Sequence, residues 1–393
     1  MIGEDRMNEL MDRLAVYVNQ ELLPLEAREG FTNESALDKK FLKAIWQRSR
    51  ELGFYGIHLP KEYGGMDISV TELCQIKEML ARSGSALFLH VLGEMGGPLR
   101  VGEIMKFATP EQMERFFLPV IRGEKASCFA LSEPNAGSDA TGIQASAVKE
   151  GEEYVLNGCK QYITMAPIAD FAIILAVTDP DRGPGGVSAF LVEADRPGYK
   201  LSDPVIPMSG THFDCNIYLK DCRVPAANLL GQEGAGFLMA MDRINVNRLL
   251  HCPTMIGLAQ NLLDRSIAHA KNRKQFGRSI GDFQAIQHML ANMAIGIYAG
   301  RSMVLAAAAK ADKGQDIRKE AAMCKVFCSE KAFEVADLAV QIHGNVGLTK
   351  GHPVEVLFRT LRMYRIVVGT SEIQRNTIAR ALLKESKGLP QNQ

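Results

Sequence analysis

The stretch FALSEPNAGSDATG, residues 129–142, marks the point where a helical pattern gives way to strands. From Asp5 to about Arg122, apolar residues recur at three- and four-residue spacing, which is typical of amphipathic helices. After Gly123 the chain shows short β-branched or alternating runs, with turns such as Asn157-Gly158 between them. This pattern predicts a compact set of antiparallel strands that follows an N-terminal helical segment.

A helical period returns at about Gly236 and persists through long apolar segments such as FQAIQHMLANMAIGIYAGRSMVLAAAAKAD, residues 283–312. Helices this long and this apolar usually pack as a bundle. We therefore predict an α+β, mainly α fold with three domains. These are an N-terminal helical domain (1–122), a middle antiparallel β domain (123–235) and a C-terminal four-helix bundle (236–393). A chain of 393 residues is long enough for this division.

Composition excludes several classes of protein. The 45 basic and 45 acidic residues give a formal net charge of zero without a basic run, which argues against nucleic-acid binding. No run of 18 apolar residues predicts a membrane span, and the acidic, amphipathic start is not a signal peptide. The eight cysteines are scattered without a C-x-x-C pair, so neither a metal site nor a disulfide framework is expected. A reducing cytoplasm fits these free thiols best.

Two segments of the β region place polar groups where a flat ligand could lie. The turn in residues 129–142 presents backbone N–H groups and hydroxyls that suit a polar ring edge or a phosphate, although an ordinary surface turn would look the same. In NGCKQYITMAP, residues 157–167, Tyr162 and Thr164 are alternate strand residues and share a face. A core tyrosine is the alternative interpretation.

Three further motifs lie in the helical C-terminal part. In NRKQFGRSIGDFQAIQ, residues 272–287, a guanidinium, an amide and an aromatic ring could hold a nucleotide diphosphate, or could simply cap an interhelical turn. The segment QIHGNVGLTKGHPVE, residues 341–355, supplies a glycine-rich helix end. The segment GTSEIQR, residues 369–375, begins a helix at Thr370, and free N–H groups at a helix start favour an anion.

These five motifs, in this α–β–α order, resemble the acyl-CoA dehydrogenase family of flavoproteins over essentially the whole chain. The resemblance implies FAD held between the β domain and the C-terminal bundle and shared with a neighbouring subunit. It also implies an acyl-CoA substrate, a homotetramer, and an electron-transfer flavoprotein as the electron partner.

The resemblance also implies roles for individual residues. Ser132 matches the residue at the pyrimidine edge of the flavin, Thr164 the hydroxyl near flavin N5, and the motif at 272–287 the groups that hold the ADP half. The full set implied for FAD is Phe129, Leu131, Ser132, Tyr162, Ile163, Thr164, Arg273, Gln275, Phe276, Gln284, Gln341, Gly344, Asn345, Thr370 and Glu372. The set implied for the CoA substrate is Ser138, Asn245, Arg248 and Gly369, where Asn245 departs from a common aspartate.

The family's catalytic base is missing from both of its usual positions. Members of the family remove the Cα proton of the thioester with a carboxylate while the Cβ hydride passes to flavin N5. The glutamate before the Gly-Thr turn is replaced here by Val368, and the alternative position before Arg248 is occupied by Asn247. Neither side chain can accept a proton at neutral pH.

Three explanations compete for this loss. The base can be relocated to SALFLHVLGEMGGPL, residues 85–99, in the family's acyl-pocket wall, where Glu94 ranks slightly above His90. His251 and Asp242 rank further behind. A hydrogen-bonded core histidine and a solvated helix end are the plain alternatives for His90 and Glu94.

The second explanation is flavin chemistry without an α-proton base, such as enoyl-CoA reduction, decarboxylation or desulfination. The third is an oxygen-using reaction or a non-catalytic role. A helical protein that binds a partner or nucleic acid through its long helices remains as a hypothesis from a different class.

Overall fold

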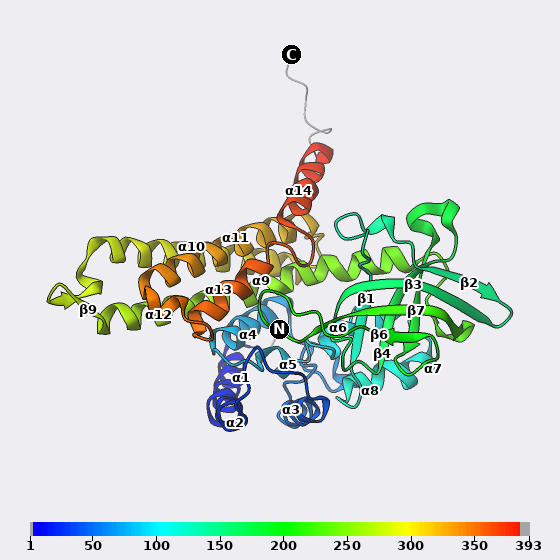
Figure 1. Ribbon diagram of the computed structural model, residues 1–393, viewed down its shortest axis with the longest axis horizontal. Coiled ribbons are helices and arrows are strands. Elements are labelled where there is room, and N and C mark those ends of the chain that lie inside the picture. Colours follow the sequence, from blue (N-terminus) through cyan, green and yellow to red (C-terminus); the bar gives the residue numbers. More distant parts are fainter. Residues whose placement is uncertain (1–2, 386–393) are drawn as a thin grey trace, which may run out of the picture. The chain divides into compact units, whose positions relative to one another are not determined.

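The computed structural model describes residues 3–385 (Figure 1). The chain divides into two compact units. The helical unit contains residues 3–27, 69–85 and 245–385, and the sheet unit contains residues 28–68 and 86–244. The three predicted domains, 1–122, 123–235 and 236–393, stay a prediction, and their outermost ends lie outside the described residues.

The sheet unit is built on one sheet with the strand order β6-β7-β3-β2-β4-β5-β8, and β1 pairs with β4. Its strands are β1 (Ser127–Ala130), β2 (Ser146–Glu150), β3 (Glu153–Thr164), β4 (Phe171–Val177), β5 (Val187–Glu193), β6 (Tyr199–Leu201), β7 (Asp214–Pro225) and β8 (Leu229–Leu230). Most pairs are antiparallel as predicted, but β1 and β4 run parallel, as do β2 and β4 at a single residue pair. Alternation along a strand carries no information on the direction of its neighbour, which is why the sequence could not show this.

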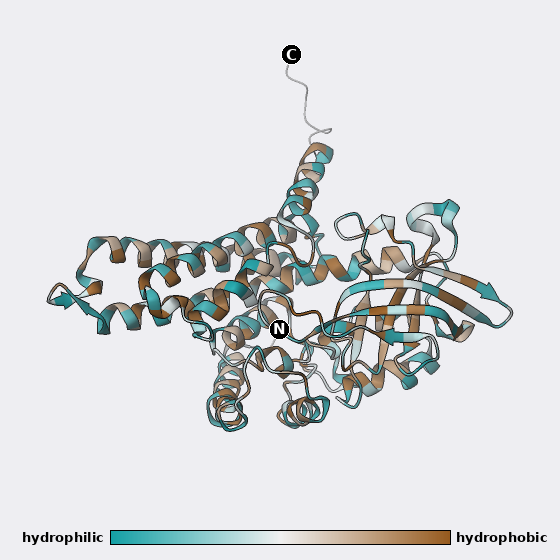
Figure 2. Ribbon diagram, viewed as in Figure 1, coloured by the Kyte–Doolittle hydropathy of each residue, from teal (hydrophilic) through white to brown (hydrophobic). Residues whose placement is uncertain are grey.

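Apolar residues on the strands and on short helices form the core of the sheet unit. The helices are α3 (Lys39–Glu51), α5 (Phe88–Val91), α6 (Pro98–Val101), α7 (Pro110–Gln112) and α8 (Leu118–Ile121). The ring of Phe171 on β4 lies 5.0 Å from that of Phe116 and 6.2 Å from that of Phe117, between centroids. The central strands β4 and β5 are hydrophobic along most of their length (Figure 2), because both of their faces are covered.

Long helices form most of the helical unit. They are α1 (Glu4–Tyr17), α4 (Val70–Arg82), α10 (Gln284–Ala311), α11 (Arg318–His343), α13 (Pro353–Met363) and α14 (Ser371–Glu385), and the single-turn helix α12 (Asn345–Leu348) lies between α11 and α13 in the chain. Helix α2 (Leu23–Glu29) and the 37-residue helix α9 (Gly236–Asn272) each continue from one unit into the other. Helix α11 packs against α10, α13 and α14, and the hairpin of β9 (Lys274–Gln275) and β10 (Arg278–Ser279) joins α9 to α10. The predicted fold class is therefore confirmed.

Among the residues 3–385, α10 alone is long and apolar enough to cross a membrane by length and composition. This is weak evidence, because the core helix of a globular protein passes the same test. The most apolar window of α10 is 28 % buried, and the helix packs along α11.

Candidate flavin and substrate site

The first two motifs come together in the sheet unit. The backbone N–H of Gln161 donates to the carbonyl of Ser132 over 2.8 Å, which joins the end of β1 to β3. Phe129 and Leu131 are half-buried and pack against the core of the sheet unit. The strand end that carries Ser132 therefore lies beside the strand that carries Tyr162, as a shared flat ligand requires.

A β-bulge in β3 turns Tyr162 outward. The pairing of β3 with β7 shifts register between Lys160 and Ile163, and Tyr162 has a φ of +57°. Its ring is 61 % exposed, whereas Ile163 is buried in the core. Bulges re-aim side chains and often occur beside active sites. The hydroxyl of Thr164 donates a hydrogen bond to the half-buried carboxyl of Asp214 on β7.

A buried ion pair that the sequence did not reveal holds this wall together. The Nζ of Lys160 lies 2.6 Å from Oε1 of Glu133 and also donates to the carbonyl of Leu131 over 3.2 Å. The Glu133 carboxylate accepts the backbone N–H groups of Gln144 and Ala145 at 2.7 and 3.0 Å. Because the glutamate lies within the 129–142 motif, the pair anchors the turn that follows β1.

The relocated-base candidate Glu94 lies in a cluster of charged groups. It is half-buried. Burial lowers the pKa of Arg100, and the charges of Glu94 and Asp214 offset part of this shift. This environment differs from a solvated helix end. Arg243 on α9 completes the cluster, since its Nε donates to the carbonyl of Arg100 over 3.1 Å. Arg243 was not among the predicted site residues.

The other candidate, His90, has the contacts of a core histidine. Its side chain is 1 % exposed, and its Nδ1 accepts the indole N–H of Trp46 over 3.2 Å. The ring of Phe213 lies edge-on at 6.4 Å between centroids. Burial lowers the pKa of His90 to about 4, so its imidazole is neutral at pH 7. These contacts favour the structural interpretation of His90.

The motif at 272–287 forms an exposed hairpin in the helical unit. Phe276 and Gly277, with φ values of +52° and +79°, make the turn between β9 and β10. The Phe276 ring is 93 % exposed, with Arg273 and Gln275 on the same hairpin arm, and Gln284 begins α10. The aromatic ring, the guanidinium and the amide thus lie on one exposed hairpin, and their role in binding a nucleotide stays a prediction.

The next motif ends α11 with a conformation that only glycine adopts readily. Gly344 has φ +60° and ψ −138°, which separates Gln341 near the end of α11 from Asn345 at the start of α12. Gln341 and Asn345 are both exposed.

The turn before α14 carries Val368 where the resemblance implies a glutamate, and hydrogen bonds hold its backbone. Val368 has a φ of +59°, which is costly for a β-branched residue. The carbonyl of Gly369 accepts the Nζ of buried Lys325 over 2.7 Å, and Nε2 of Gln374 donates to the carbonyls of Val368 and Gly369, at 3.2 Å each. The hydroxyl of Thr370 accepts the N–H of Ile373 over 3.3 Å and so caps α14.

Three of the four predicted substrate residues gather at this turn. Nη1 of Arg248 donates to Oδ1 of Asn245 over 2.8 Å, and a Cβ on Gly369 would lie 3.7 Å from Nη2 of Arg248 and 2.5 Å from Nε2 of Gln374. The position therefore requires glycine. The buried Nε of Arg248 has no partner among the described residues, which leaves a donor for a ligand.

The remaining predicted residues have plainer positions. Ser138, Asp242 and Glu372 are exposed, and Asn247 is half-buried on α9. The ring of His251 lies 6.3 Å from that of Tyr364, between centroids.

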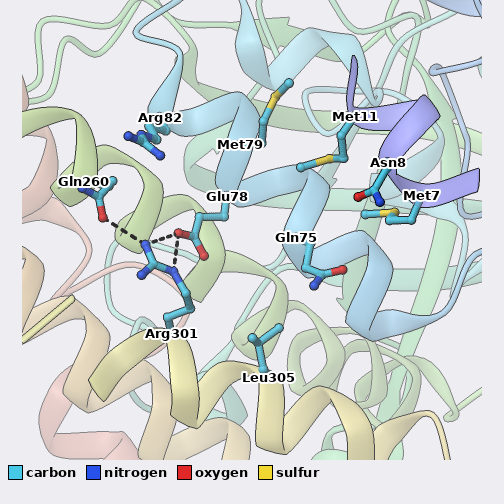
Figure 3. A pocket seen from close by; sticks show the side chains of 10 residues that line it. All are labelled: Met7, Asn8, Met11, Gln75, Glu78, Met79, Arg82, Gln260, Arg301 and Leu305. Carbon is cyan, nitrogen blue, oxygen red and sulfur yellow. Dashed lines mark hydrogen bonds and ion pairs between the residues drawn. The ribbon is translucent and has the colours of Figure 1, made fainter. Parts of the chain in front are cut away.

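A separate pocket of about 500 Å³ lies in the helical unit between α1, α4, α9 and α10 (Figure 3). Arg301 crosses it, with Nη2 2.6 Å from Glu78 and 3.0 Å from Oε1 of Gln260. Met7, Met11, Met79 and Leu305 line the apolar side. None of the residues predicted for FAD or substrate lines this pocket.

The order of helices, sheet and helices is the one expected of a flavin-dependent oxidoreductase of the predicted class. The chain belongs to the acyl-CoA dehydrogenase family. Models of that family's N-terminal, middle and C-terminal domains match residues 5–124, 128–222 and 234–383.

Curated relatives of this chain include several enzymes named as reductases. It is 38 % identical to a 3-(aryl)acrylate reductase from Clostridium sporogenes, over 96 % of this chain and 98 % of that protein. It is 39 % identical to the caffeyl-CoA reductase–Etf complex subunit CarC of Acetobacterium woodii, over 88 % and 91 %. It is 37 % identical to acryloyl-CoA reductase (NADH) of Anaerotignum propionicum, over 86 % of each.

Solved structures show the same fold. Butyryl-CoA dehydrogenase from Megasphaera elsdenii superposes with a TM-score of 0.87 at 31 % identity, over 98 % of this chain and 99 % of that chain. PigA with FAD and proline superposes with a TM-score of 0.88 at 26 % identity, over 98 % and 99 %. The chain is thus a family oxidoreductase that acts on a CH–CH group of an acyl-CoA, which sets the helical binding protein aside.

Proposed function

We propose that this chain binds FAD and reduces the Cα=Cβ double bond of an α,β-unsaturated acyl-CoA. The observation that carries the proposal is the absence of a titratable side chain at Val368, on the turn before α14, and at Asn247, on α9, the two positions where the resemblance implies a catalytic glutamate. The reductase names of the three relatives support the same direction.

In the direction of reduction, the group at the base position acts as a proton donor instead. Dehydrogenation begins with the removal of a weakly acidic Cα proton, for which a general base contributes about 10²–10⁴-fold. Reduction passes through a thioester enolate, and water can protonate this strongly basic carbon in a downhill step. By microscopic reversibility, loss of the base slows both directions by the same factor, so the direction of net reaction is set by the reduction potentials of the bound flavin and the substrate.

The residues that would hold FAD fit the cofactor. FAD, when bound, exchanges a hydride with the substrate at its N5 atom. Ser132 would bind the pyrimidine edge, Tyr162 would flank the ring, and the Arg273–Phe276 hairpin would hold the ADP half. Asn245, Arg248 and Gly369 would face the thioester. The exposed rings of Phe276 and Tyr162 and the unpartnered Nε of Arg248 support this assignment.

An anaerobic comparison of the two directions tests the proposal. Photoreduced protein mixed with crotonyl-CoA should regain its flavin absorption within seconds. Oxidised protein mixed with butyryl-CoA should bleach about 100-fold more slowly or not at all. Val368→Glu should accelerate bleaching, because it restores a carboxylate at the family position.

Fast bleaching of the wild-type protein would contradict a base-free reductase. If Glu94→Gln abolished that bleaching, the relocated-base explanation would hold instead. This second candidate is favoured by one observation, the half-buried position of Glu94, whose charge acts on Arg100.

We also propose an electron-transfer flavoprotein as the electron partner. The name of the caffeyl-CoA reductase–Etf complex subunit supports this. Reoxidation or reduction of the flavin on mixing with a purified electron-transfer flavoprotein would test it.

A homotetramer remains our proposal for the assembly. The apolar side chains Ile295 and Tyr298 on α10 are 66 % and 70 % exposed in the single chain and suit a face covered by another copy. Light scattering on the purified protein tests this. The cytoplasm remains our proposal for its location, because all eight cysteines are free.

A further inference from the structure

The turn before α14, residues 368–370, has its carbonyl groups bound by the protein and its N–H groups left over. Nε2 of Gln374 donates to the carbonyls of Val368 and Gly369, at 3.2 Å each. Nζ of Lys325 donates to the carbonyl of Gly369 over 2.7 Å, and the backbone N–H of Gln374 donates to the carbonyl of Thr370 over 3.0 Å. The N–H groups of residues 368–370 have no hydrogen-bond partner among the described residues. The turn therefore keeps its donors, rather than its acceptors, for a ligand.

Lys325, on α11, brings a positive charge to this turn. Its side chain is fully buried, and the Gly369 carbonyl is its only hydrogen-bond acceptor within residues 3–385, where no carboxylate lies at ion-pair distance from it. Burial lowers the pKa of Lys325 to about 8, so it is charged at pH 7. The titratable groups that act on it are Cys252 and Arg248 on α9, Glu330 on α11 and Glu372 on α14. A carbonyl offsets only part of the cost of burying such a charge, which indicates a role besides packing.

The backbone conformation of the turn favours a negatively charged oxygen as the ligand. Val368 and Gly369 are consecutive left-handed residues, with φ values of +59° and +89°. Successive N–H groups in turns of this kind form concavities that bind anions. The buried Nε of Arg248 also has no partner among the described residues, and Nη2 of the same guanidinium would lie 3.7 Å from a Cβ on Gly369. A further unpaired donor thus lies close to the turn.

We propose that Lys325 is a positioning residue, which binds the Gly369 carbonyl and so holds the N–H groups of residues 368–370 where they stabilise the enolate oxygen of the thioester. The inference rests on the proposed function for the placement of the thioester at this turn. Addition of a hydride to Cβ leaves an electron pair shared by Cα and the thioester oxygen, so this oxygen gains negative charge that the substrate lacks.

Donors held in place before the reaction stabilise the enolate more than they stabilise the neutral substrate. The charge on Nζ of Lys325 adds to this effect, because it polarises the peptide group that joins the Gly369 carbonyl to the N–H of Thr370. Lys325 therefore acts on the reacting oxygen through the backbone and does not touch the substrate.

Binding of acetoacetyl-CoA to the oxidised, FAD-loaded protein tests the assignment without turnover. This thioester loses a proton to give an enolate with its own ultraviolet absorption, whereas crotonyl-CoA has the same number of acyl carbons and stays neutral. Spectra and calorimetry give the affinity for each form. Lys325→Met should weaken binding of the enolate about 10–100-fold and should change binding of crotonyl-CoA much less. Lys325→Arg keeps a cationic donor and should restore part of the loss. Lys331→Met, at a 41 % exposed lysine of the same helix, is the matched control and should bind both thioesters as the wild type does.

A pH profile tests the same assignment in proteins that keep a cation at position 325, in case Lys325→Met does not fold. Lys325 loses its charge as the pH rises from 7 to 9. The rate at which crotonyl-CoA reoxidises photoreduced wild-type protein should therefore fall about 5-fold or more over this range, because a neutral amine is the weaker donor. Lys325→Arg should show a smaller fall, since a guanidinium stays charged at pH 9.

Three results would overturn the inference. The first is a folded Lys325→Met that binds the enolate as tightly as the wild type does. The second is equal weakening of the enolate and of crotonyl-CoA, which would assign Lys325 to the stability of the turn alone. The third is the same pH profile in wild type and Lys325→Arg. A wild-type protein that reduces no enoyl-CoA, but whose enolate binding depends on Lys325, would refute the proposed reaction and leave this inference standing.

Discussion

Two buried cations in the sheet unit differ in how the chain compensates them. Lys160 lies 2.6 Å from the Glu133 carboxylate and also donates to a backbone carbonyl, so its charge is balanced inside the protein. Arg243 has one carbonyl, one ring and a second arginine as neighbours. A compensated charge stabilises the fold, whereas an uncompensated one is explained more readily by a ligand.

The same contrast recurs at two uncharged positions. His90 is buried, but the indole N–H of Trp46 satisfies its Nδ1, and it stays neutral. Val368 is held in a left-handed conformation, and the bonds to its turn from Lys325 and Gln374 maintain a shape that valine itself disfavours. Strained backbone conformations of this kind occur most often at binding and active sites.

The largest effect on the free energy of unfolding is expected at Lys160, the cation that Glu133 compensates. Lys160→Met should lower the free energy of unfolding by about 3–5 kcal/mol, because it leaves the Glu133 carboxylate buried without its cation. Urea denaturation followed by circular dichroism measures this. The double variant Lys160→Met/Glu133→Gln should recover part of the loss. A single-variant loss below about 1 kcal/mol would show that the pair is not what holds the turn after β1.

The next largest effect is a dependence of protein stability on pH that comes from His90. Its pKa is about 4 in the folded protein and 6.5 in the unfolded chain, so between these values the unfolded chain binds more protons. Stability should therefore fall as the pH drops below 6.5, by about 2 kcal/mol at pH 5 from this group. His90→Gln keeps an acceptor for Trp46 and should lose less stability than wild type between pH 7 and pH 5. Equal losses of stability in the two proteins would mean that a group other than His90 causes the pH dependence.

Much of the fold could be predicted because local patterns encode it. The return of helical spacing at Gly236 and the alternating runs after Gly123 lie in the residues themselves, and the order of five motifs led to the family. The parallel pairing of β1 with β4 and the left-handed bulge at Tyr162 could not be predicted, since both depend on neighbours distant in sequence.

The site was predicted less completely than the fold. The pair of Glu133 and Lys160 spans 27 residues and has no local signal. Arg243 did have a local signal in the sequence. It follows the buried residues Met239 and Ala240 at helical spacing, and so it places a charge on an apolar helix face. A search for charged residues on the apolar faces of helices would have found it.

Replacing Arg243, the uncompensated cation, should change the free energy of unfolding in the opposite direction from replacing Lys160. Arg243→Met should raise the free energy of unfolding of the ligand-free protein by about 1–2 kcal/mol, because an apolar side chain of similar length needs no counterion. Thermal and urea unfolding would measure it. A loss of several kcal/mol instead would mean that Arg243 is compensated within the fold, and the contrast with Lys160 would disappear.

The smallest effect is expected at Val368. Asparagine tolerates a φ of +59° far better than a β-branched residue does, so Val368→Asn should stabilise the protein by about 1 kcal/mol. Val368→Ile, which keeps the β-branch, is the matched control and should leave stability nearly unchanged. A destabilising Val368→Asn would mean that packing of the valine side chain outweighs its backbone cost, so that this position, like His90, is compensated within the protein.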